Sequence, residues 1–174
     1  DGLVITAYKG HEDIVEVPEN IGKDTVVAIG DHAFSPFVPR AQNKDARRNL
    51  RQVILPETIR EIEKNAFYHC YRMDYVVIPS GIEKIGDRAF ASCENLSNVV
   101  IPKGVKTIER FFADCINLKR VEISEGVKGI GSVAFAGCTA LAEIHIPNSV
   151  ISIDSSVFYR CSNITIHAPV GSYA

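Results

Sequence analysis

Apolar residues recur along the chain at a nearly constant interval. One column of Phe repeats every 22 or 23 residues, and a column of Cys follows it by three residues. The Phe column is Phe67, Phe90, Phe112, Phe135 and Phe158, and the Cys column is Cys70, Cys93, Cys115, Cys138 and Cys161. Because a fixed period of about 20–50 residues marks stacked structural units, the pattern predicts a repeat solenoid.

Each unit also predicts its own local structure. One unit reads Leu96, Val99, Ile101, Pro102, Val105 and Ile108. The alternation of Val99 and Ile101 is typical of a short strand, and Pro102 ends it because proline cannot donate to a ladder. Stacked units then align these strands in one parallel sheet. We expect the return segment around Ala89–Phe90 to form turns or a short helical or 3₁₀ piece on the other side.

The Cys column is expected to lie in the interior. Cysteine is among the most buried residue types and packs there as a small hydrophobe. Like residues in adjacent coils lie roughly 5 Å apart, which is within reach of a disulfide, but stacked side chains point the same way. Zinc is a further alternative, although no C-x₂-C pair is present and the five His form no ligand spacing with the Cys. Free, buried thiols are therefore favoured.

Composition limits the classes of function. The chain has 174 residues and a net charge of −2, with 46% hydrophobic and 23% charged residues. These values are typical of a folded domain, and they give no field that would attract nucleic acid. No apolar run is long enough for a membrane span. Nucleophile motifs and phosphate-binding Gly-rich loops are also missing, so the sequence predicts no catalytic, cofactor-binding or metal-binding residue and no cofactor.

The repeats divide the chain into three parts of a single domain, 1–174. Residues 1–25 form a degenerate N-terminal cap, 26–163 hold the repeats, and 164–174 form a C-terminal strand or cap. An insertion near 38–49 interrupts the count after Phe34, and it is either a binding feature or a solvated loop. The chain begins at Asp1 without Met. We expect a trimmed chain, so a missing signal peptide carries no information on location.

The units resemble the BspA-type, or treponemal-type, leucine-rich repeat. The stretches from Ile85 to Cys93 and from Ile130 to Cys138 are close instances of its Ile-Gly-x3-Ala-Phe-x2-Cys segment. The resemblance implies an α/β-type leucine-rich-repeat solenoid that is mainly β. It also implies a secreted or surface protein of the kind found in bacteria and some protists. Several members are associated with adhesion to host matrix proteins or cells, but the motif itself carries over no contact residue.

Partner binding is expected where the columns vary. The variable positions of the strands face outward on the concave face that solenoids use for binding. These candidates are Gln52, Ile54, Tyr75, Val77, Asn98, Val100, Arg120, Glu122, Glu143 and His145. An apolar stripe with an aromatic residue and a charged border is typical of a protein-binding patch. The same residues are also explained by the β propensity of Val and Ile, or by oligomerisation through the stripe.

Two classes of non-catalytic function follow, and an enzyme is the third alternative. The first is an adhesion module that binds a protein or a glycan at a cell surface or in a matrix. The second is a structural spacer in a longer surface chain. An enzyme needs titratable groups that converge in a cleft, whereas Glu143 and His145 beside Glu122 are explained by an exposed ion-pair cluster.

Overall fold

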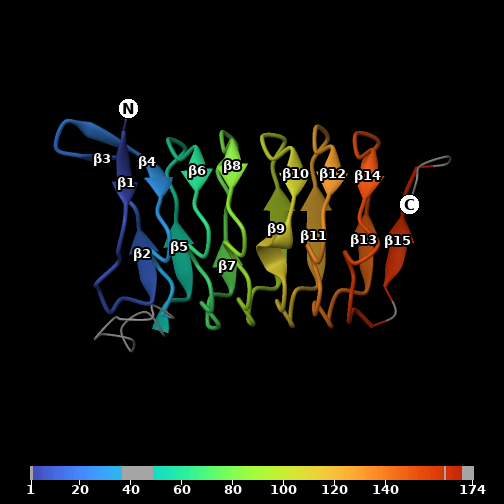
Figure 1. The fold of residues 1–174 in the computed structure, drawn as a ribbon. Helices are drawn as coiled ribbons and strands as arrows, with labels where there is room; N and C mark the ends of the chain where they lie inside the picture. The colour runs from blue at the N-terminus through green and yellow to red at the C-terminus, as the bar shows by residue number, and fades with distance from the viewer. Residues whose placement is uncertain (1, 37–48, 163, 170–174) are drawn as a thin grey trace.

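Short strands, nearly all of them parallel, stack in two rows in the part of the chain that the structure describes (Figure 1). The computed structural model describes residues 2–36, 49–162 and 164–169. The first row contains β2 (Ile14–Glu16), β5 (Gln52–Ile54), β7 (Tyr75–Val76), β9 (Asn98–Ile101), β11 (Arg120–Ile123), β13 (Glu143–His145) and β15 (Thr165–His167). The second contains β1 (Leu3–Ile5), β4 (Asp24–Ile29), β6 (Glu61–Ile62), β8 (Lys84–Ile85), β10 (Thr107–Ile108), β12 (Gly129–Ile130) and β14 (Ser152–Ile153). The strands β1 and β15 lie at opposite ends of the stack.

The register between neighbouring strands is one repeat. Val53 pairs with Val76, Val99 with Val121, and Ile144 with Ile166, always in parallel. Among the strands that the structure describes, only the short β3 (Asn20–Ile21) runs antiparallel, and it pairs with β4. Because the register equals the sequence period, every apolar column becomes a continuous stripe along the solenoid. The predicted mainly β, parallel-stranded solenoid is confirmed.

On the side opposite the first row, we expected turns or short helical segments. The turns are found, whereas the short helical segments are not supported. A second row of strands lies there, and the Ala89–Phe90 segment forms turns. The 3₁₀ turn η2 (Arg110–Phe112), however, is a short helical piece among the described residues. The backbone explains this result, because Arg88 and Ser92 both have positive φ, at 55° and 58°. An α-helix needs consecutive negative φ values, so two left-handed residues four positions apart prevent it.

Aromatic rings and thiols fill the interior in two ladders. Phe67 and Phe90 stack with 5.1 Å between ring centroids and 2° between planes, and the stack continues through Phe112 and Phe135. Tyr8 stacks on Phe34 at the N-terminal end of this ladder. None of the five Cys, all of which the structure describes, forms a disulfide, as predicted; four are buried and Cys161 is half-buried. The conspicuous Phe and Cys columns are therefore core elements.

Both ends of the stack carry strands that pair with the neighbouring coil. β1 and β2 pair with β4 and β5 of the first coils, and β15 pairs with β13 as the last strand described. The predicted insertion lies outside the described residues except for Asn49, and the division into cap, repeats and C-terminal strand stays a prediction. No helix in the described ranges is both long and apolar enough to span a bilayer.

Candidate functional site

The predicted partner-binding residues lie together on the outer face of the first strand row. They come from five successive strands, β5, β7, β9, β11 and β13, or follow them directly, as Val77 follows β7. Their inward neighbours Val53, Val76, Val99, Val121 and Ile144 are buried in the core. Since side chains alternate along a strand, burial of one set places the other set outward. Nine of the ten candidates are exposed, and Gln52 is half-buried.

The centre of this face is apolar. Ile54, Tyr75, Val77 and Val100 remain 43%, 48%, 52% and 51% exposed. Val and Ile at such positions support neighbouring strands laterally, so their type alone does not require a partner. Their grouping on consecutive coils makes a continuous apolar stripe, which is a common feature of interaction sites on soluble proteins.

An open groove of about 720 Å³ crosses the stripe at β7, β9 and β11. Val77 and Val100 contribute apolar side chains to it, together with Tyr75. Arg120 and Glu122 of β11 line it as well. The groove therefore combines an apolar part with polar groups, which is the usual composition of a binding surface.

Charges of both signs line the groove. In the register of β9 and β11, Asn98 lies opposite Arg120 and Val100 lies opposite Glu122. Lys103 and Glu125 follow these strands and line the same groove. A mixed border favours a partner with charges of both signs over a uniformly charged polymer such as nucleic acid.

The face extends beyond the candidate residues at both ends. Register places Ile14 and Glu16 of β2 beside Gln52 and Ile54. At the other end, Thr165 and His167 of β15 lie opposite Glu143 and His145. β2 shows the same alternation as the candidates, because Ile14 and Glu16 are exposed and Val15 between them is half-buried. In β15, at the end of the stack, all three residues are exposed. Continuing the columns into the terminal units would have found these four residues.

The deeply buried thiols of Cys93 and Cys115 are poor nucleophiles in the native chain. Burial raises the pKa of the Cys93 thiol, and it raises the pKa of Cys115 to about 12. A thiol with a raised pKa is a poor nucleophile, because the reactive form is the thiolate. The Cys column therefore has a packing role.

Comparison with known proteins agrees with the architecture. The family model described as the BspA type leucine-rich repeat region matches residues 45–165 in six copies. A comparison with curated protein sequences finds no match.

Solved structures with the same fold come from several bacteria. A leucine-rich cell surface protein from Faecalibacterium prausnitzii is 30% identical, with a TM-score of 0.67 over 95% of this chain and 50% of that one. The pneumococcal vaccine antigen PcpA is 23% identical, with a TM-score of 0.77 over 98% and 44% of the two chains. A leucine-rich repeat protein from T. pallidum is 27% identical, with a TM-score of 0.51 over 81% and 83%. The chain thus spans about half the length of the first two.

Proposed function

Because the chain belongs to the BspA-type leucine-rich repeat family, we propose that it is a non-catalytic binding module of a bacterial cell-surface or secreted protein. The groove across β7, β9 and β11 is the site of binding. The single observation that carries this proposal is the apolar stripe of Ile54, Tyr75, Val77 and Val100, about half exposed on consecutive coils. The similarity to a leucine-rich cell surface protein supports the location.

The composition of the groove favours a protein partner. Val77 and Val100 offer apolar contact area, and Tyr75 adds an aromatic side chain with a polar end. Tyrosine and arginine are enriched among the residues that dominate binding energy at protein interfaces, and Arg120 lines the same groove. A glycan could also stack on Tyr75, but the aliphatic stripe beside that ring offers few hydrogen bonds to sugar hydroxyls.

Binding to purified extracellular matrix proteins and to a glycan array tests the proposal directly. Val77→Glu places a charge within the groove, and Tyr75→Glu does so at its aromatic side chain. Ile151→Glu is the matched control, because Ile151 is 70% exposed and lies next to β14 in the other row. Each groove variant should weaken binding at least about tenfold, since the contacts that dominate an interface contribute about 2 kcal/mol or more. The control should bind like the parent chain.

Three outcomes would overturn all or part of this assignment. Equal binding by the parent chain and by the groove variants would place the contact on another surface. Binding to no protein or glycan would favour the alternative, a structural spacer whose neighbouring segments make the contacts. Glycan binding with no protein binding would overturn the choice of partner class but keep the groove.

A further inference from the structure

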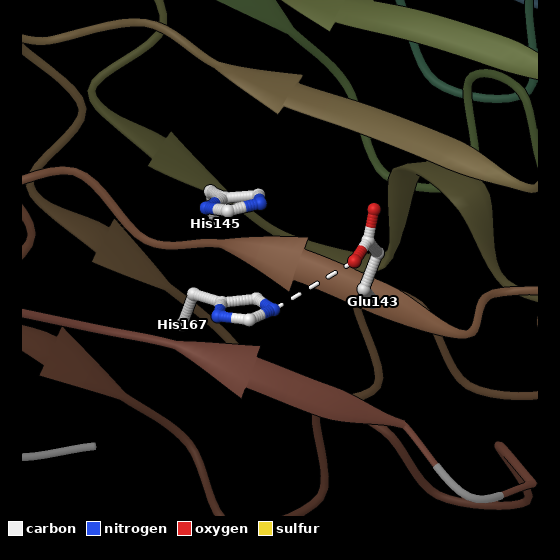
Figure 2. Close-up of side chains that lie close together, drawn as sticks. All are labelled: Glu143, His145 and His167. Carbon is white, nitrogen blue, oxygen red and sulfur yellow. Dashed lines mark ion pairs between the residues drawn. The ribbon is translucent and has the colours of Figure 1, made fainter.

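Three side chains with metal-ligating atoms meet on the outer face of the last two described strands of the first row (Figure 2). Glu143 and His145 belong to β13, and His167 belongs to β15. One ligand atom from each lies within 4.8 Å of the other two. All three side chains are exposed, so water and dissolved ions reach them.

The strand register creates this cluster. His145 lies opposite His167 in the parallel pair β13–β15, and Glu143 is two residues before His145 on the same face of β13. The two imidazole rings stack with 4.4 Å between centroids and 10° between planes. Nε2 of His167 lies 3.7 Å from Oε2 of Glu143. Figure 2 shows a nitrogen of each ring on the side where the carboxylate lies.

We propose that Glu143, His145 and His167 form a binding site for a divalent transition-metal ion, with zinc as the best fit. Two imidazoles and one carboxylate are a ligand set that suits zinc, whereas magnesium and calcium prefer oxygen alone. Three protein ligands leave the fourth position of a tetrahedral zinc ion open. Here that position faces solvent, where water or a carboxylate of a bound molecule would complete the coordination.

The geometry needs only side-chain adjustment. Bonds of about 2.0–2.2 Å to a tetrahedral ion place the ligand atoms roughly 3.3 Å apart. The three atoms must therefore close in from separations of up to 4.8 Å. Rotation of exposed side chains achieves this without moving the strands, because backbone spacing is fixed by the β13–β15 register. The ion would then connect two neighbouring coils.

The sequence predicts no metal-binding residue, whereas this proposal names three. His145 and His167 are separated by one repeat, and Glu143 completes the set only when the coils stack. A search for ligands within one segment, or between His and Cys, does not find them. The inference is independent of the groove, because it rests on residues outside the groove lining.

Calorimetric titration of the metal-free chain with Zn²⁺ tests the site. We expect saturable binding of one ion per chain. Loss of an outer partner of a ligand commonly costs about 10–100-fold in metal affinity, so loss of a ligand should cost at least tenfold. His145→Ala and His167→Ala should each show this loss, and Glu143→Gln should also bind more weakly. His11→Ala is the matched control, because His11 is exposed and distant in sequence from the cluster.

Cobalt substitution separates this site from the thiols. A cobalt complex of the parent chain should show tetrahedral d–d bands without thiolate-to-cobalt charge transfer. The variants should melt like the parent chain when no metal is present, since the three side chains are exposed. Non-saturable binding, equal affinity in the His variants, or a thiolate spectrum would overturn the proposal. In the first case the cluster would be only an exposed ion pair of His167 and Glu143.

Discussion

The thiol of Cys115 donates a hydrogen bond to the carbonyl oxygen of Phe90, one coil earlier, with 3.2 Å between Sγ and O. The same contact joins Cys93 to Phe67 and Cys138 to Phe112. A thiol is small, largely apolar and still a weak donor. This combination explains why Cys, rather than Ala or Ser, stands at a buried position that faces a backbone carbonyl. The Cys column thus links each coil to its neighbour as well as filling space.

Cys115→Ala should lower the free energy of unfolding by about 1–2 kcal/mol, because it removes both a buried sulfur and a donor to the Phe90 carbonyl. Cys161→Ala is the control. Cys161 makes the same contact to Phe135 at 3.1 Å, but it is only half-buried. Its replacement should cost less than half as much. Urea denaturation measures both, and equal costs would show that burial of the thiol does not set its contribution.

The stability of the chain should fall at alkaline pH. Burial raises the pKa of Cys115 from the ordinary 9.0 to about 12, and it raises those of Cys93 and Cys138 in the same direction. A raised pKa in the folded state favours the protonated thiol. Its stabilising contribution is therefore complete below pH 9 and is lost as the pH rises toward 12. Within that window, each such thiol should lower the free energy of unfolding by about 1.4 kcal/mol per pH unit.

Urea titrations at pH 8 and pH 10 measure this loss, and the Cys115→Ala variant should lose less between the two values than the parent chain. Equal losses in the two chains would assign the alkaline sensitivity to other groups.

The core was the most predictable part of the fold. The period of the apolar columns indicates interior positions, and Ile85 and Ile108, two members of one such column, are both buried. The second strand row was not predicted, because β8 and β10 contain only two residues each. Two residues are too few to show the alternation of apolar and polar positions from which a strand is predicted. Only the stacking of neighbours makes such segments into strands.

The outward face could be predicted from the same repeat pattern. The proposed metal-binding cluster could not. Val77 and Val100 follow from alternation around buried residues within one strand. The meeting of His145 and His167 depends on register across two coils and on side-chain direction. A single sequence predicts the register of β13 and β15 only if the repeat is aligned through the last unit, which is atypical.

Val133→Asn should stabilise the chain. Val133 is β-branched and has φ of 51°, in the left-handed region, while Asn65 occupies the same column of an earlier coil with φ of 54°. That conformation costs an ordinary L-residue about 1–2 kcal/mol, and Asn tolerates it. We expect a gain of about 1 kcal/mol in the free energy of unfolding. Val133→Ala, which keeps most of the backbone penalty, should gain less than half of this. A neutral or destabilising Val133→Asn would mean that the turn is not strained.

The sign of a charge introduced at Val100 should determine the free energy of unfolding of the variant. Val100 lies directly opposite Glu122 in the β9–β11 pair, and both side chains are exposed. Like charges across a strand pair destabilise by up to about 1 kcal/mol, and opposite charges stabilise by a similar amount. Val100→Glu should therefore unfold at lower urea concentration than Val100→Lys in dilute buffer. In about 1 M salt, where the screening length is roughly 3 Å, the difference should largely vanish.

The comparison also explains why Val77 is the better position for the binding test. Its column neighbours on either side, Ile54 and Val100, are apolar, so a glutamate there meets no carboxylate. If Val100→Glu and Val100→Lys were equally stable in dilute buffer, Val100 and Glu122 would not face each other. The apolar and charged parts of the groove would then not be adjacent, and the assignment of its two parts would have to be revised.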